Sequence, residues 1–84
     1  MDVRQEVLHA LDEVLSLGGR ARRFTADTPL LGAVPELDSM AVVALITTLQ
    51  ERLGVNFHDD DFDGESFRTV GTLTALVGER LAHA

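Results

Sequence analysis

The sequence predicts a small all-α protein, a four-helix bundle with three main helices, one short helix and a long first connection. Apolar residues recur at helical spacing in three separate stretches, and glycine follows the first two. The one strand-like segment, residues 55–57, is too short to build a sheet. With 84 residues, 45% of them hydrophobic, the chain predicts a single globular domain over residues 1–84.

The first predicted helix covers residues 2–17, and polar residues fill the face opposite its apolar stripe. Gly18 and Gly19 favour an end there. The stripe consists of Val3, Val7, Leu8, Leu11, Val14 and Leu15.

Residues 18–37 form a connection that is long for so small a domain. Such a segment is usually functional or held down by its own apolar residues, and we expect the latter here. The apolar residues are Phe24, Leu30, Leu31, Val34 and Leu37. The connection also carries a cluster of Arg20, Arg22 and Arg23. Two interpretations of this cluster stay open: a solvated surface, or a patch that steers a protein partner.

The second predicted helix runs from Ser39 to Leu53 and ends at Gly54. Its core face consists of Val42, Leu45, Ile46, Leu49 and Leu53. The opposite face consists of Met40, Val43, Ala44, Thr47 and Glu51. Because four of these five residues are uncharged, this face is either packed against the long connection or used to bind a partner.

The rest of the chain allows one short helical turn in residues 59–64 and a last helix capped by Thr69. That helix is expected to bury Val70, Leu73, Leu76, Val77 and Leu81.

Composition excludes several classes of function. A net charge of −7 argues against nucleic-acid binding, which needs clustered cations. Without cysteine the protein has no disulfide and no thiol nucleophile of its own. No apolar run reaches the length of a membrane span and no signal peptide is evident, so we expect a cytoplasmic protein. The histidines, His9, His58 and His83, fall in no catalytic motif, so no enzyme is indicated.

Calcium binding is the main rival function. Asp59, Asp61, Asp63 and Gly64 match positions 1, 3, 5 and 6 of an EF-hand loop. The twelfth position, where a bidentate glutamate closes the site, is Val70. We therefore predict no metal site.

The most informative residues are Asp38 and Ser39, a polar step into the second helix. A helix N-terminus offers unpaired N–H groups and a partial positive charge, which suit a phosphate. Ser39 either caps the helix or is the point where a phosphate-linked group is attached.

Three segments resemble acyl carrier proteins. Leu37-Asp38-Ser39-Met40 resembles their Asp-Ser-Leu attachment motif, with Met40 in place of the usual leucine. Phe24–Leu30 resembles the loop upstream of that motif, and Thr69–Leu73 resembles the start of the last helix. The order and spacing agree, so the resemblance covers essentially the whole chain and implies an acyl-carrier-protein-like fold.

The resemblance implies that a phosphopantetheinyl transferase adds a 4′-phosphopantetheine arm from coenzyme A to Ser39. Acyl or aminoacyl groups would then travel as thioesters on the arm between acyl-loading and acyl-accepting enzymes, on a non-catalytic, monomeric carrier. Asp38 is expected to cap the helix or to engage the transferase and its metal. Recognition of partners is assigned to Asp38, Met40, Val43, Ala44 and Thr47.

The second helix departs from many fatty-acid carriers, which place several acids there, whereas Glu51 is the one acid among its outward positions. The sequence around Ser39 looks more like stand-alone carriers found with bacterial exosortase and exopolysaccharide systems. A discrete peptidyl or aminoacyl carrier is the nearest alternative. A calcium-binding module and an unmodified helical interaction module remain alternatives of another class.

Overall fold

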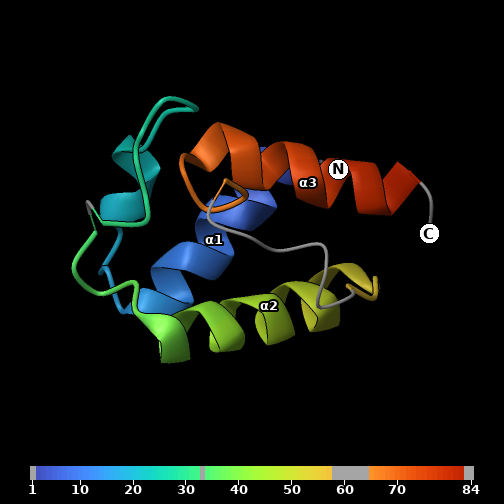
Figure 1. The fold of residues 1–84 in the computed structure, drawn as a ribbon, viewed down its shortest axis with the longest axis horizontal. Coiled ribbons are helices and arrows are strands. Elements are labelled where there is room, and N and C mark those ends of the chain that lie inside the picture. Colours follow the sequence, from blue (N-terminus) through green and yellow to red (C-terminus); the bar gives the residue numbers. More distant parts are fainter. Residues whose placement is uncertain (1, 33, 58–64, 83–84) are drawn as a thin grey trace.

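The computed structural model describes residues 2–32, 34–57 and 65–82. Four elements follow one another: α1 (Val3–Leu15), the 3-10 helix η1 (Arg20–Arg23), α2 (Ser39–Leu53) and α3 (Val70–Ala82) (Figure 1). Within the described ranges, pairing of extended backbone is limited to one bridge between Pro29 and Thr69. The all-α prediction is confirmed. The predicted short helix at 59–64 lies outside the described residues.

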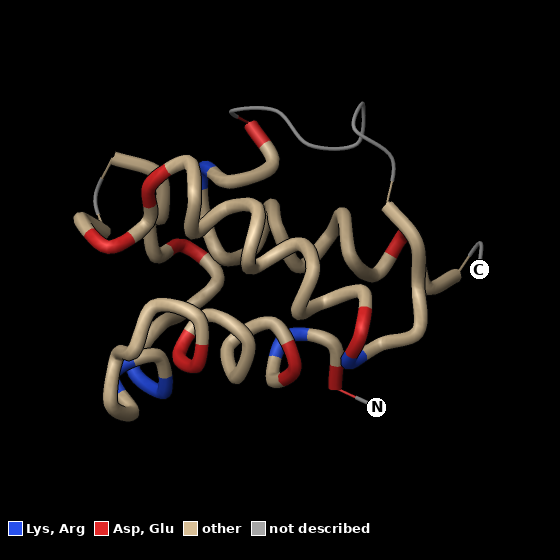
Figure 2. Tube along the Cα trace, turned by 90° about the horizontal axis from the view of Figure 1, so that it is seen from below, with Lys and Arg blue, Asp and Glu red and all other residues tan. Residues whose placement is uncertain are grey.

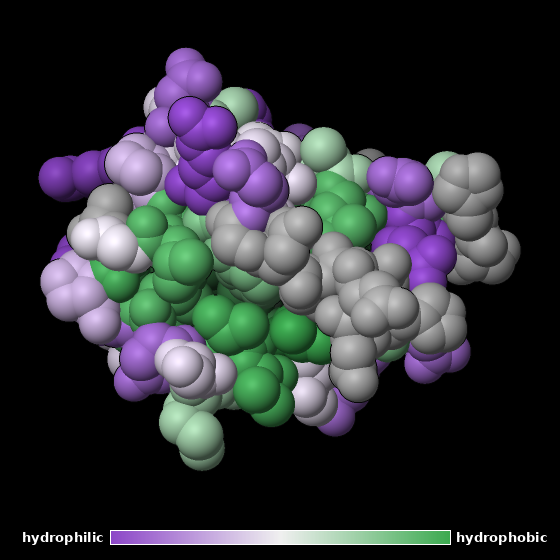
Figure 3. Space-filling model, in the orientation of Figure 1, coloured by the Kyte–Doolittle hydropathy of each residue, from purple (hydrophilic) through white to green (hydrophobic). Residues whose placement is uncertain are grey.

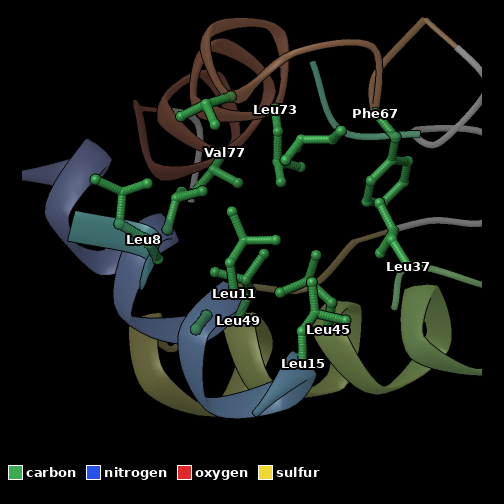
Figure 4. Close-up of a cluster of buried hydrophobic side chains, with 14 of the residues drawn as sticks. Leu8, Leu11, Leu15, Leu37, Leu45, Leu49, Phe67, Leu73 and Val77 are labelled. Carbon is green, nitrogen blue, oxygen red and sulfur yellow. The ribbon is translucent and has the colours of Figure 1, made fainter. Parts of the chain in front are cut away.

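Helix α1 is the packing centre, because it contacts both α2 and α3 (Figure 1). Leucines from all three helices meet in one apolar cluster, which Phe67 and Leu37 extend from the connecting segments (Figure 4). The largest fully buried side chains are Val7, Leu11, Leu30, Leu45, Leu49, Val70, Leu73 and Val77. The predicted core is confirmed in its centre. Six predicted members are only half-buried at its edge: Val3, Val14, Val42, Ile46, Leu53 and Leu81. Leu76 is half-buried as well.

Helix α1 ends two residues earlier than predicted. Ser16, not a glycine, takes the left-handed conformation with φ of 53°. The Leu17 N–H then donates to the Asp12 carbonyl oxygen at 3.0 Å, and the Leu17 side chain is only 4% exposed. This bond is the 6→1 bond of a Schellman motif, and burial of Leu17 offsets the cost of a left-handed serine.

The long connection is held by backbone pairing with the segment that enters α3. Leu30 N–H donates to the Arg68 carbonyl at 3.0 Å, and Leu31 N–H donates to the Phe67 carbonyl at 2.9 Å. In return, the N–H groups of Val70 and Gly71 donate to the carbonyls of Thr28 at 3.0 Å and Ala26 at 2.8 Å. We call these four bonds the loop ladder. These bonds pair backbone N–H and C=O groups of residues 26–31, which belong to no helix or sheet that could pair them.

Burial of the connection's apolar residues confirms its predicted anchoring, with one exception. Leu30 and Leu37 are buried, and Phe24 and Val34 pack against the core. Leu31 is 49% exposed, so its expected burial is wrong. Leu31 begins a turn, which the Val34 N–H closes on the Leu30 carbonyl at 2.9 Å, and turns of this kind run over the surface.

Helix η1 is an element that the sequence did not predict. The half-buried Asp12 carboxylate holds it, because one oxygen accepts the N–H groups of Gly19 at 2.9 Å and Ala21 at 3.2 Å. Ala21 is itself buried. An ion pair then joins η1 to the end of the connection, with Arg20 Nη2 2.6 Å from Glu36 Oε2. The Arg20 guanidinium lowers the pKa of the Glu36 carboxyl, chiefly through this hydrogen bond.

Gly71→Ala should destabilise the protein, because an added Cβ would lie 2.9 Å from the Ala26 carbonyl oxygen, which the ladder holds in place. We expect a loss of about 1–3 kcal/mol in urea unfolding, typical of overpacking. Gly78→Ala is the matched control, since a Cβ there meets nothing within 4 Å and should stabilise α3 by about 0.5–1 kcal/mol. Equal stability of the two variants would contradict this role of the ladder.

Glu36 should titrate below its ordinary pKa of 4.5 in the folded protein. A lowered folded-state pKa means that the pair stabilises the fold above the unfolded pKa and loses this effect as the pH falls through the folded pKa. NMR titration of the side-chain carboxyl should show the low pKa, and Arg20→Gln should return it towards 4.5. Arg23→Gln, a neighbouring change in a residue without a described partner, should leave the midpoint where it is in the wild type.

Candidate functional site

Asp38 forms the N-terminal boundary of α2. This residue is extended, with φ of −107° and ψ of −174°, and its Oδ1 accepts the Ala41 N–H at 2.8 Å. The Asp38 carbonyl accepts the Val42 N–H at 2.9 Å as the first bond of the helix. Asp38 is therefore the N-cap, as one of its two predicted roles required.

Ser39 is the first residue of α2, and its side chain is exposed. Because Asp38 occupies the cap position, the alternative in which Ser39 caps the helix is wrong. Within the described part of the chain, the Ser39 hydroxyl has no hydrogen-bond partner. It is left as an accessible alcohol at the helix N-terminus.

The backbone around Ser39 favours an anion. The first three N–H groups of a helix lack intrahelical acceptors, and Asp38 satisfies only that of Ala41. The N–H groups of Ser39 and Met40 have no acceptor among the described residues. Together with the helix dipole, they provide a partial positive charge next to the Ser39 oxygen. An exposed hydroxyl with two free donors beside it fits a phosphodiester.

Two carboxylates lie near this end of α2 in sequence, and both are engaged. Asp38 gives one oxygen to the helix N-terminus, and Glu36 is paired with Arg20. Their negative charges are thus partly compensated before any phosphate is added. The capping hydrogen bond also reduces the repulsion between the Asp38 carboxylate and a phosphate on the neighbouring serine.

The outer face of α2 is open to solvent. Met40 is 79% exposed and Val43 is 63% exposed, and Ala44 and Thr47 are also exposed. The alternative in which this face packs against the long connection is therefore wrong. Figure 3 shows that the apolar surface extends from the region of the connection to α2, with polar residues around it. Leu31 is the third large apolar side chain that the described residues expose, and no pattern in the sequence indicated its exposure.

The described residues contain no group of three or more acidic, histidine or cysteine side chains that could hold a metal ion. The acids of the EF-hand-like segment, Asp59, Asp61 and Asp63, lie outside them. Val70, at the position of the closing glutamate, is fully buried in α3 and has no oxygen on its side chain to offer. Among the described helices, none is long and apolar enough to cross a membrane.

Comparisons with known proteins agree with this geometry. The family model "phosphopantetheine attachment site" matches residues 5–77. The solution structure of a holo acyl carrier protein from Nitrosomonas europaea matches with 42% identity and a TM-score of 0.91, covering 99% of this chain and 100% of that one. A search of curated proteins gave no match.

A family match over most of the chain, together with a shared fold at this level of identity, settles the class to which the molecule belongs. The chain belongs to the phosphopantetheine attachment family and is a carrier protein whose prosthetic group is covalently attached phosphopantetheine.

Proposed function

We propose that the hydroxyl of Ser39 is the attachment point of the 4′-phosphopantetheine arm. The observation that carries this assignment is the division of roles at the start of α2, where Asp38 caps the helix and Ser39 stays free. Attachment joins the Ser39 oxygen to the pantetheine-bearing phosphorus of coenzyme A. The phosphate bond to the adenosine 3′,5′-bisphosphate breaks, and a base in the transferase takes the hydroxyl proton.

On this assignment the protein is a non-catalytic acyl carrier that acts as a monomer in the cytoplasm and uses residues 1–84 as one domain. The chain has no cysteine, so the thiol that holds an acyl or aminoacyl group belongs to the arm. Its partners are the phosphopantetheinyl transferase and the enzymes that load and accept the acyl group. The protein presents the arm, and those enzymes perform the chemistry.

The partner surface that we propose is the outer face of α2, made of Met40, Val43, Ala44 and Thr47, with Asp38 at its edge. Its support is exposure without charge: large apolar side chains face solvent there, which is unusual for a surface helix. Contact with an enzyme would remove this apolar area from water.

The low charge of this face also favours a specialised carrier over a housekeeping one. Glu51 is the one acid on the exposed positions of α2. We infer a stand-alone carrier of the type found with bacterial exosortase and exopolysaccharide systems. A discrete peptidyl or aminoacyl carrier is the second candidate, which the same uncharged face would also serve.

Mass spectrometry tests whether Ser39 is the attachment point of the arm. Incubation with a promiscuous phosphopantetheinyl transferase, magnesium and coenzyme A should add one phosphopantetheine mass to the wild-type chain. Ser39→Ala should gain none while keeping the wild-type thermal stability, since Asp38 still caps α2. An unmodified wild type, or an equal gain by Ser39→Ala, would refute the assignment.

Val43→Asp should weaken acyl transfer by a cognate enzyme, because docking would desolvate the new carboxylate. We expect kcat/KM to fall about tenfold or more, with the fold intact, because Val43 is exposed. Ala75→Asp places the same charge at an exposed position of α3 and should leave transfer unchanged. Full transfer by Val43→Asp would show that the interface lies elsewhere.

A further inference from the structure

The positive charge of the protein is concentrated on η1. Three of its seven cations, Arg20, Arg22 and Arg23, lie within four residues, in a chain of net charge −7. Figure 2 shows basic residues at this end of the molecule with acidic residues beside them, and Asp12 and Glu36 contact this segment through its backbone and through Arg20. Arg20 is occupied by Glu36 and by the Leu17 carbonyl. Arg22 and Arg23 are exposed, and neither has an ion-pair partner among the described residues. Two guanidinium groups are therefore available to an anionic surface.

The support of these two arginines is firm. Asp12 accepts the N–H groups of Gly19 and Ala21, and the side chains of Ala21 within η1 and Leu17 just before it are buried. Arg20 adds a contact to the connection through Glu36. A cation presented from a fixed backbone loses less entropy on binding than one on a loose loop. Arg22 and Arg23 on this fixed backbone are thus suited to binding an anionic partner as well as to keeping the protein soluble.

A surface cleft of about 630 Å³ lies between α1 and η1, next to this pair. Its lining includes Arg22, His9, Gly18 and Gly19. Of the two acids that also line it, Asp12 already accepts backbone N–H groups, and Glu13 lies 3.6 Å from Arg52. The cleft therefore leaves Arg22 open to solvent on η1, with both neighbouring acids already in contact with other groups.

The cluster lies where an enzyme must approach. Figures 1 and 2 both place η1 and the start of α2 at the same end of the molecule. The Arg20–Glu36 pair ties η1 to the residues just before Ser39. An enzyme that acts on Ser39 can contact η1 without leaving that end.

We propose that Arg22 and Arg23 bind an acidic surface of the phosphopantetheinyl transferase that modifies Ser39, a proposal that rests on the attachment function of Ser39. The outer face of α2 supplies apolar contact but little charge, so the electrostatic part of recognition falls to η1. Opposite charges speed encounter and fix orientation more than they hold the complex.

Initial rates with the transferase of the same organism, coenzyme A and magnesium test this proposal. Arg22→Glu and Arg23→Glu should each lower kcat/KM roughly fivefold at low ionic strength, and added salt should close the gap to the wild type. Arg4→Glu is the control, because it makes the same charge change at an exposed position in the first turn of α1. Circular dichroism should show wild-type folding for all three, and Arg22→Gln and Arg23→Gln replace any reversal that fails to fold.

The outcomes separate this proposal from the one on Ser39. If the wild type is modified and the η1 variants react as Arg4→Glu does, the η1 proposal is wrong and the attachment site stands. If wild-type Ser39 gains no phosphopantetheine, the attachment assignment fails, and with it the basis for the η1 proposal. The end-point mass should be the same for every variant, since η1 changes the rate and not the chemistry.

Discussion

The position of Ser39 depends on the loop ladder. This ladder is the set of backbone hydrogen bonds between residues 26–31 and the start of α3. A long connection in a chain of 84 residues has no sheet or helix to satisfy its polar groups, so it must find partners elsewhere. The ladder supplies them and directs Leu30 into the core. Gly71 makes it possible, because a side chain there would collide with the opposing carbonyl. The position of Ser39 at the end of this connection follows from a contact made more than thirty residues later.

Helix α1 carries the second constraint. One of its faces packs on α2 and α3, while Asp12 holds the backbone of η1. The connection is thus fixed at its start by the half-buried Asp12 carboxylate, at its middle by the ladder and at its end by the Arg20–Glu36 pair. Elements that frame the serine all rest on one helix, which explains how a protein with a thin core can present a defined surface.

Local pattern predicted the three main helices, the central core and the polar step at Asp38 and Ser39, because each depends on residues close in sequence. It missed what depends on the geometry of the folded chain. Leu31 was expected to be buried, but it lies in the turn that the Val34 N–H closes on the Leu30 carbonyl and is exposed there. Helix η1 went unpredicted because Asp12, which holds it, belongs to the polar face of α1. The sequence left open whether Ser39 caps α2, and the geometry of Asp38 was needed to exclude that role.

The division of roles between Asp38 and Ser39 has an evolutionary consequence. Position 38 serves folding, since its loss would leave the start of α2 uncapped and cost about 1 kcal/mol. The Ser39 side chain is exposed and makes no hydrogen bond with the described residues, so on the attachment that we propose selection at position 39 acts on chemistry alone. A lineage that lost its transferase could replace the serine by drift and keep an intact helical protein. A descendant of that kind would keep the aspartate after the hydroxyl had gone.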